Sequence, residues 1–404
     1  MIEQKRNTYN IYMLIFLFFS IVLAYGAEYR GKIYNLLIVG GIYLIVNELL
    51  DIIKYQRINK NQLKTVFYTS TPFILNALLL LNQNLINKER HINVLILTLF
   101  STFSSVFLCK RLLTNTNKAK ITYLKMSYIW SCVNVTLFLL YKVGLYKSGN
   151  GSFSGFYINR NDFAISSVIL LFLISFIDFD KKDHLIYKKI IVTKLALTAL
   201  IISTLSIKGF VGVLIIVIYT YFLNKNKSIN KKILLIIMLL ILSPLTLLIN
   251  FDLFNRFNLY LETLLGVTAT YENANYRLTL IKQGIEIIKD NFWLGIGIDN
   301  SRYYLFVENA RGNEIGKYSH NNLIEIFLNG GIFTFIAYYI PIVFIMFSSL
   351  KKYKYNKNYL FVITGLTLKI FFDLSSVTYN NASVIFLTVI SIFCFFECNR
   401  ITKK

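Results

Sequence analysis

The stretch YSHNNLIEIFLNGGIFTFIAYYIPIVFIMFS, residues 318–348, passes from a polar opening into a long apolar run. Its opening carries a serine, a histidine and two asparagines, and Glu325 is the one charged residue in the run that follows. A helix needs roughly 17–25 predominantly apolar residues to cross the hydrocarbon core of a bilayer. The stretch therefore predicts a membrane-spanning helix over 322–348, with His320 at its mouth.

Apolar runs of this kind recur along the whole chain. The 404 residues are 55% hydrophobic, with a mean hydropathy of +0.55, a composition that a soluble domain would not sustain. We expect an all-α, polytopic membrane protein that forms a single membrane-embedded domain over 1–404. About twelve spans are predicted, at 11–25, 33–50, 65–81, 92–109, 121–141, 162–178, 190–207, 209–223, 233–250, 322–348, 359–372 and 382–397.

The basic residues indicate how the spans are oriented. The net charge of +23 comes from short Lys and Arg clusters between apolar runs, which is typical of positive-inside loops rather than of a nucleic-acid interface. With the N-terminus in the cytoplasm, the inside loops hold 25 Lys and Arg and the short outside loops hold 8. This bias predicts that both termini are cytoplasmic. The run 11–25 lacks a clear small-residue cleavage site, so we interpret it as a retained first helix.

One predicted outside loop, 251–320, is far longer than the others. Within it, the apolar residues Leu278, Ile281, Ile285 and Ile288 recur at a helical spacing, while charged residues fill the positions between them. This pattern predicts an amphipathic helix that lies on or near the outer membrane–water interface.

His320 and Glu325 are candidate catalytic residues. We expect Ser319 to cap the helix and His320 to lie in its first turn, where the helix dipole lowers the pKa of the imidazole. A neutral imidazole near pH 7 can accept a proton from a hydroxyl group. Asn321 and Glu325 share one helix face, at i and i+4, and extend the polar patch. The alternative is an interfacial histidine beside a helix cap and a buried, paired glutamate.

Three cations are predicted on the outer side, at Arg160, Lys208 and Arg277. A charged side chain at bilayer depth costs roughly 2.5–3.5 kcal/mol on insertion scales, so a cation kept there usually has an anionic partner or ligand. Three cations that converge between helices suit a phosphate or diphosphate. Each one taken alone is also explained by a side chain that extends to the interface. Three further lysines within predicted spans have no assignable role: Lys125, Lys194 and Lys369.

Two glycine pairs flank the histidine in the sequence. Gly295 and Gly297 follow a predicted helix rather than a strand, so they indicate a tight turn and not a dinucleotide-binding fingerprint. Gly330 and Gly331 interrupt the span and indicate close helix packing. The sequence contains no phosphate-binding motif of ATP-driven pumps. A zinc site is also not expected, since His184 falls on the cytoplasmic side.

Four stretches together resemble the O-antigen ligase and polymerase family of membrane glycosyltransferases, which includes capsular polysaccharide polymerases. GFYINRNDFA (155–164) is similar to an Asn-x-Asn segment that opens a span, and SIKGFVG (206–212) is similar to a Ser-Arg-Gly segment with Lys208 in place of arginine. YRLTLIKQGIEIIKDNFWLGIGIDN (276–300) resembles the family's arginine, amphipathic helix and Gly-x-Gly. SHNNLIEIFLNGGI (319–332) resembles its His-Asn, Glu and Gly-Gly signature.

The resemblance implies an all-helical fold of the GT-C type and a donor glycan carried on undecaprenyl pyrophosphate. It implies inverting transfer on the outer face of the bacterial cytoplasmic (inner) membrane, without a metal, a nucleotide sugar or another cofactor. Flippase and chain-length regulator proteins are expected as partners.

The family signature also implies roles for individual residues. Arg277 would bind the pyrophosphate, with Arg160 and Lys208 as helpers. His320 would be the base or would hold the acceptor hydroxyl, and Glu325 would orient the polar patch or share the base role. Three asparagines of the matching segments would support the site: Asn159, Asn161 and Asn321.

Three functions are compatible with the sequence. The first is a polymerase that moves a growing glycan onto the next lipid-linked repeat unit. The second is a ligase that moves finished glycan onto lipid A–core or another envelope acceptor. The third is a glycan flippase or secondary transporter, which would instead require polar residues at mid-membrane and an inverted repeat of spans.

Overall fold

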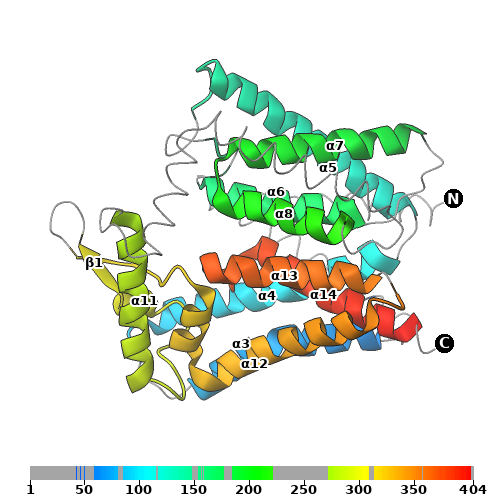
Figure 1. The fold of residues 1–404 in the computed structure, drawn as a ribbon. Coiled ribbons are helices and arrows are strands. Elements are labelled where there is room, and N and C mark those ends of the chain that lie inside the picture. Colours follow the sequence, from blue (N-terminus) through cyan, green and yellow to red (C-terminus); the bar gives the residue numbers. More distant parts are fainter. Residues whose placement is uncertain are drawn as a thin grey trace.

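The computed structural model describes residues 42, 46, 50, 59–80, 85–114, 117–147, 153–155, 157, 159–176, 184–221, 272–308, 314–356 and 358–401. Most of them form long helices (Figure 1). The helices are α3 (Lys60–Leu79), α4 (Lys88–Thr114), α5 (Asn117–Lys142), α6 (Arg160–Phe176), α7 (His184–Ser203), α8 (Ile207–Tyr221), α11 (Glu272–Asp290), α12 (Asn322–Lys352), α13 (Asn358–Ser375) and α14 (Ala382–Ile401). The 3-10 helix η2 (Ser301–Tyr303) and the strands β1 (Phe306–Glu308) and β2 (Glu314–Gly316) lie between α11 and α12.

The bundle helices form two groups that run side by side (Figure 1). One group consists of α5, α6, α7 and α8, in which α5 and α6 each pack on α7, and α8 packs on α6. The other consists of α3, α4, α12, α13 and α14. Contacts of α8 with α13 and of α6 with α14 join the two groups.

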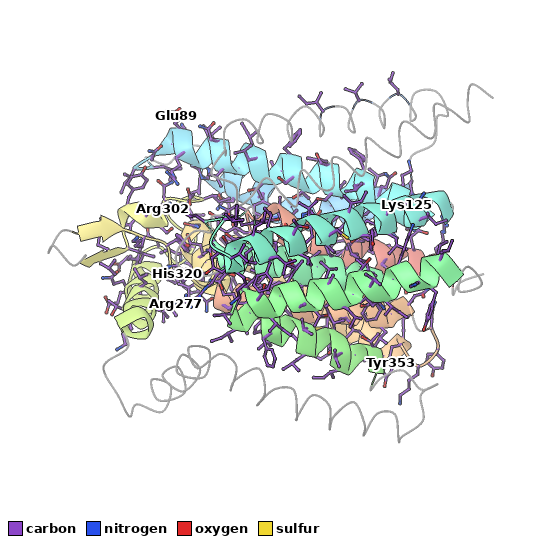
Figure 2. The ribbon with its side chains drawn as sticks, turned by 90° about the horizontal axis from the view of Figure 1, so that it is seen from above. Glu89, Lys125, Arg277, Arg302, His320 and Tyr353 are labelled. Atoms are coloured by element: carbon purple, nitrogen blue, oxygen red, sulfur yellow. The ribbon has the colours of Figure 1, made fainter. Side chains whose placement is uncertain are left out.

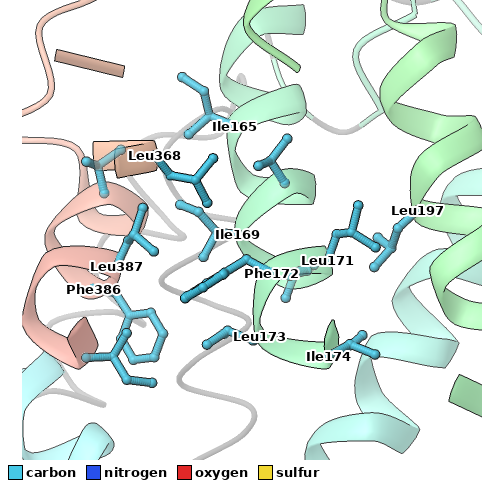
Figure 3. Close-up of a cluster of buried hydrophobic side chains, with 14 of the residues drawn as sticks. Ile165, Ile169, Leu171, Phe172, Leu173, Ile174, Leu197, Leu368, Phe386 and Leu387 are labelled. Atoms are coloured by element: carbon cyan, nitrogen blue, oxygen red, sulfur yellow. The ribbon is translucent and has the colours of Figure 1, made fainter. Parts of the chain in front are cut away.

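The main apolar core surrounds α6. All 12 residues from Phe163 to Ile174 are buried, which is the behaviour of a helix that is apolar on every side. Figure 3 shows side chains of α6 such as Ile169 and Phe172 facing Leu368 of α13 and Phe386 of α14. A helix so enclosed holds its N-terminus, at Arg160, in a fixed place.

Nine of the predicted spans correspond to helices in the described part of the chain. Five of these helices are long and apolar enough to cross a membrane, and α8 is a shorter apolar helix. The mostly helical membrane fold is therefore confirmed, whereas the count of twelve spans stays a prediction. The predicted spans 11–25 and 233–250, and all of 33–50 except residues 42, 46 and 50, lie outside the described residues.

Where the structure describes them, residues predicted on opposite sides of the membrane lie at opposite ends of the bundle. Figure 2 shows Arg277, Arg302 and His320 together at one end and Lys125 and Tyr353 at the other. The positive-inside pattern assigned the first three to the outside and Tyr353 to the inside. The structure thus agrees with the predicted grouping of these segments.

The fold near His320 depends on a kink in α12 at Gly331, where φ is 63° and ψ is −172°. The segment that follows α11 crosses this kink and bonds to its main chain. The N–H of Ile296 donates to the carbonyl of Leu328 at 2.9 Å, and the N–H of Gly297 donates to the carbonyl of Asn329 at 2.8 Å. These bonds satisfy carbonyl groups where the regular helix is interrupted.

The reverse bond completes this arrangement, which we term the kink lock. The N–H of Ile332 donates to the carbonyl of Phe292 at 2.8 Å instead of to a carbonyl of its own helix. A Cβ atom on Gly331 would lie 2.2 Å from the carbonyl oxygen of Trp293, and one on Gly295 would lie 2.6 Å from the main chain of α12. Both predicted features, a tight turn and close packing, are therefore parts of one contact between two main chains.

The predicted amphipathic helix is present as α11, and Figure 1 shows it running across the direction of the bundle helices. The face that packs on α12 neighbours the apolar face predicted for the membrane interface. Leu280, Gly284 and Ile288, spaced four residues apart, face the first part of α12, and a Cβ on Gly284 would lie 2.8 Å from Ile324. Of the predicted face, Ile288 is buried but Ile285 is exposed. The helix is apolar on two neighbouring faces, so periodicity alone does not identify the packed one.

The long loop also contains a short antiparallel hairpin of β1 and β2, which the all-α prediction omitted. The hairpin is fixed to α11 by Gln283, whose side-chain amide donates to the carbonyl of Phe306 at 3.1 Å and accepts from its N–H at 3.3 Å. Strands of three residues are too short to leave a clear alternating pattern in the sequence.

The kink lock predicts an unequal effect of alanine at two glycines that share a positive φ. Gly295 (φ 73°) faces the main chain of α12, whereas Gly144 (φ 77°) has nothing within 4 Å of its Cβ position. Both variants carry the cost of a left-handed alanine, roughly 1 kcal/mol. We expect Gly295→Ala to lose about 2 kcal/mol more than Gly144→Ala, measured by thermal unfolding in detergent. Equal losses would contradict the lock.

Candidate functional site

His320 lies directly before α12, in a left-handed conformation with φ of 55°. Asn321 is the N-cap, because its side chain accepts the N–H groups of Leu323 at 2.9 Å and Ile324 at 3.3 Å. The predictions that Ser319 caps the helix and that His320 lies in the first turn were wrong. Asparagine and serine are comparable N-caps, so the sequence did not discriminate between the two positions.

Ser319 instead bonds to Glu325, which is fully buried. One carboxylate oxygen accepts the N–H of Ser319 at 3.0 Å and its hydroxyl at 2.8 Å. The other accepts the hydroxyl of Ser301 and the side-chain amide of Asn329 at 3.2 Å. A carboxylate with four donors and no exposure fits the orienting role, since it joins the loop before α12 to η2 and to the kink lock.

Two of the three predicted cations flank His320. Arg277 in α11 and Lys208 in α8 are both close enough to lower the pKa of the imidazole by electrostatic repulsion. They are also within range of one another. Lys208 lies in the first turn of α8 rather than in the inter-span loop where it was expected. Figure 2 shows Arg277 and His320 adjacent at the same end of the bundle.

The N-termini of α6 and α8 are joined beside these cations. The side chain of Asn159 accepts the N–H of Asn161 at 2.9 Å, which caps α6. The side-chain oxygen of Asn161 in turn accepts the hydroxyl of Ser206 at 2.8 Å, and Ser206 accepts the N–H of Gly209 at 3.4 Å to cap α8. Both predicted supporting asparagines therefore position helix ends.

Arg160 is the first residue of α6 and is partly buried there. Asp162, two residues further on, was missed by the sequence analysis. It lies within electrostatic range of Lys208 and of Tyr318. Its position directly after the Asn-x-Asn segment was the available signal.

Tyr318 and Arg302 were also missed. The ring of Tyr318 packs on the ring of His320 with a centroid distance of 4.2 Å. The guanidinium carbon of Arg302 lies 5.4 Å from the centre of the same tyrosine ring, within the range of a cation–π contact. Arg302 also lies 3.3 Å from a carboxylate oxygen of Asp299. The contact of Tyr318 with Arg302 has no sequence pattern, because the two residues come from separate segments of the region between α11 and α12, whereas Asp299 and Arg302 are only three residues apart.

The imidazole of His320 is neutral near pH 7. Burial and the neighbouring cations Arg277, Lys208 and Lys317 lower its pKa to about 3, from an ordinary value of 6.5. Burial, with the negative charge of Asp162 adding to it, raises the pKa of Tyr318. The site therefore presents a neutral base and a protonated phenol.

Lys369, one of the three lysines that had no assignable role, belongs to a buried network below the site. It forms an ion pair with Asp373 and donates to the hydroxyl of Tyr338 at 3.1 Å. The hydroxyl of Tyr339 donates to Asp373 at 3.0 Å and accepts from the side-chain amide of Asn322 at 3.0 Å. Because Asn322 is the first residue of α12, the network joins the start of this helix to α13.

The remaining unassigned lysines lie away from these contacts. Lys125 is exposed at the opposite end of the bundle (Figure 2). Lys194 is partly buried in the middle of α7.

Potential metal ligands do not cluster in the part of the chain that the structure describes: no three His, Cys, Asp or Glu side chains come together there. His91, the second histidine at this end of the bundle, has a structural bond. Its Nδ1 accepts the N–H of Ile298 at 2.8 Å, which ties α4 to the loop after the kink lock.

The comparisons with known proteins bear on this end of the molecule. Residues 192–339 match the O-antigen ligase family. The matching segment contains Lys208, Arg277, His320 and Glu325, so the resemblance inferred from the sequence is confirmed. No curated protein matches the chain. The similarity of this segment to the O-antigen ligase family supports membrane glycan transfer of the ligase or polymerase type.

A pH titration tests the protonation state of His320. We expect its imidazole to stay neutral from pH 5 to 8, because burial and three cations oppose the charged form. In the unfolded chain the same imidazole takes up a proton near its ordinary pKa of 6.5. The free energy of unfolding therefore decreases as the pH falls below 6.5, because protons then bind to the unfolded state in preference to the folded state. The measurement is NMR of protein labelled at its three histidines, assigned with His320→Asn. A midpoint near 6.5 for His320 would contradict this environment.

Removing the cation of the Lys369–Asp373 pair tests the buried network. We expect Lys369→Met to destabilise the protein by about 3–5 kcal/mol, because Asp373 would remain buried without its partner. The double variant Lys369→Met/Asp373→Leu should regain most of that loss, since an apolar pair has no charge to desolvate. Thermal unfolding in detergent measures both, and a double variant as unstable as the single one would argue against this account.

Proposed function

We propose that this protein is a polysaccharide polymerase, acting on O-antigen or capsule repeat units. It transfers a glycan from a lipid pyrophosphate to a sugar hydroxyl of the next lipid-linked repeat unit. The observation that carries the proposal is the grouping of Arg277 and Lys208 around the neutral imidazole of His320. The family match over 192–339 supports glycan transfer in general.

The donor would be bound through its diphosphate by Arg277 and Lys208. The N-termini of α6 and α8 lie beside these cations, and helix N-termini attract anions through their N–H groups and dipoles. Arg160, at the start of α6, is the proposed third cation of the diphosphate site. Fixed positive charge of this kind stabilises the leaving diphosphate as its negative charge grows. A donor on undecaprenyl pyrophosphate suits a site at the lipid boundary.

The transfer itself requires one proton movement. The oxygen of the acceptor hydroxyl forms a bond to the anomeric carbon, and the bond from that carbon to the diphosphate oxygen breaks. The diphosphate leaves with the electron pair, and the hydroxyl proton goes to the imidazole of His320. A single displacement of this type inverts the anomeric centre. Glu325 takes no proton in this scheme, because its carboxylate is enclosed by four donors.

Donor binding would also raise the basicity of His320. Two of the four causes that lower its pKa are the charges of Arg277 and Lys208. A bound diphosphate offsets both charges, so the imidazole becomes a better proton acceptor once the donor is in place. Premature protonation of an empty site is disfavoured by the same charges.

The proposed location is the outer face of the bacterial inner membrane, with both termini cytoplasmic. Basic loops at the end opposite His320 support this orientation. The transverse direction of α11 and the exposure of Trp293 next to it, at 63%, suit a segment at the membrane–water interface. Flippase and chain-length regulator proteins are the proposed partners.

A ligase is the second candidate, because the matching family is described as O-antigen ligase. The two activities differ in the acceptor, and glycan analysis of a deletion strain separates them. Single repeat units on the lipid carrier indicate a polymerase, whereas unattached long chains indicate a ligase. A flippase is disfavoured by the gathering of polar residues at one end of the bundle.

Substitution of the two central residues tests the proposal. We expect His320→Asn and Arg277→Ala each to reduce long-chain glycan about 100-fold or more, because they remove the base and the main diphosphate ligand. Asparagine tolerates the positive φ of His320, so the fold is preserved. Glycan gels and membrane immunoblots measure product and protein level. Arg400→Ala, an exposed arginine in the last turn of α14, is the control. Normal chain length in both central variants would overturn the proposed site.

A further inference from the structure

A second group of cations lies near His320, and we term it the arginine clamp. It consists of Arg90 in α4 and Arg302 in η2, both bonded to Asp299. The carboxylate is buried, with 6% of its side chain exposed, whereas the arginines are 39% and 42% exposed. Both contacts are made by Nε, at 2.5 Å and 3.3 Å. The clamp therefore presents two guanidinium groups on one carboxylate and a net positive charge.

The clamp is preorganised by its surroundings. Asp299 has a φ of 59°, a left-handed conformation. It comes directly after Ile298, whose N–H bonds to His91, and two residues after Gly297 of the kink lock. The next residue, Asn300, accepts the N–H of Asn87 at 3.1 Å, and the side chain of Asn87 donates to Tyr303 at 2.8 Å. These contacts fix the loop that carries Asp299 to the start of α4.

The clamp reaches His320 through Tyr318, whereas the charges of the donor cations act on the imidazole itself. Figure 2 shows Arg302 and Arg277 on either side of the histidine. Tyr318 links the clamp to the imidazole, since its ring contacts both Arg302 and His320. The cations that shift the pKa of His320 do not include Arg302. The clamp and the donor cations thus reach the imidazole by different routes, the clamp by way of the Tyr318 ring.

In an inverting transfer, the leaving diphosphate and the incoming acceptor hydroxyl lie on opposite faces of the reacting sugar, so each group of cations can be matched to one of the two substrates. The acceptor hydroxyl approaches the anomeric carbon on the face opposite the leaving diphosphate. If Arg277 and Lys208 hold the leaving group, the acceptor approaches from the other side of His320, where the clamp lies. We propose that Arg90 and Arg302 form an acceptor subsite that binds an oxyanion of the acceptor glycan. This inference rests on the proposed function and identifies the charge of its second substrate.

Arginine chemistry determines the class of ligand. A guanidinium fork matches the two oxygens of a carboxylate or phosphate, and two forks held by one aspartate attract an anion more than a neutral sugar. The oxyanion has two possible sources: the carboxylate of an acidic sugar next to the reacting hydroxyl, or the diphosphate of the acceptor's own lipid carrier. Both place negative charge one aromatic ring away from the imidazole.

The test compares acceptors of different charge with the full-length protein in proteoliposomes. The donor is the lipid-linked repeat unit that accumulates in a deletion strain. The acceptors are the same glycan on its lipid diphosphate, the glycan on a neutral alkyl chain, and each of these with any sugar carboxylates reduced to alcohols. Initial rates give kcat/KM for each acceptor with the wild type, Arg302→Gln, Arg90→Gln and, as a matched arginine control, Arg400→Gln.

We expect the wild type and Arg400→Gln to prefer an anionic acceptor at least about tenfold, through KM, and both clamp variants to lose that preference. Loss of preference on carboxylate reduction identifies an acidic sugar, and loss on removal of the diphosphate identifies the lipid headgroup. Arg302→Lys should retain part of the preference, which separates charge recognition from a folding defect.

Two results would overturn the inference. Either the wild type uses neutral and anionic acceptors equally, or the clamp variants discriminate as the wild type does. Absence of transfer to every acceptor, with folded wild-type protein, would instead refute the proposed function itself.

Discussion

The site at the end of the bundle depends on main-chain hydrogen bonds between the segment after α11 and the kink of α12. Without those bonds, the carbonyls of Leu328 and Asn329 would lack partners at the break in the helix. With them, Phe292–Gly297 and the first part of α12 become one rigid unit. Three parts of the site near His320 are attached to this unit: α11, the loop that carries Asp299, and the buried carboxylate of Glu325.

The positively charged side chains near His320 come from different secondary structure elements. Lys208 comes from the start of α8, Arg277 from α11, and Arg302 from a single turn of 3-10 helix. None of these positions is adjacent to another in the chain, and their mutual repulsion is tolerated because Asp162, Asp299 and the helix dipoles offset part of it. A cluster of unlike elements can be assembled only after the bundle itself has formed, which explains why the apolar core around α6 matters for chemistry at the rim.

The sequence predicted the large features because they have strong periodic signals. Apolar runs gave nine of the helices, and the order His-Asn, Glu, Gly-Gly carried the resemblance to O-antigen ligases that the match over 192–339 supports. It failed where the decisive contacts are local or irregular. The N-cap was misplaced by two residues, from Asn321 to Ser319, since both residue types cap well. The packing of α11 on α12 was not predicted, because the helix carries two apolar faces, of which α12 covers one.

The missed residues share a physical cause. Tyr318, Arg302 and Asp299 meet through φ values and turns that no repeating pattern encodes, and Asp299 and His320 both have left-handed backbones without being glycine. Lys369 was visible as a charge inside an apolar run, but its partner Asp373 could be recognised only from helix spacing and burial together.

Contacts made by main-chain atoms have a consequence for how this protein can diversify. The kink lock restricts a few glycines, while most side chains of the segment play no part in its hydrogen bonds. The exposed faces around it are therefore free to vary in shape and polarity while the imidazole stays in place. The same backbone could therefore serve many different sugars, with sequence differences confined to the exposed side chains of a loop whose backbone conformation is fixed.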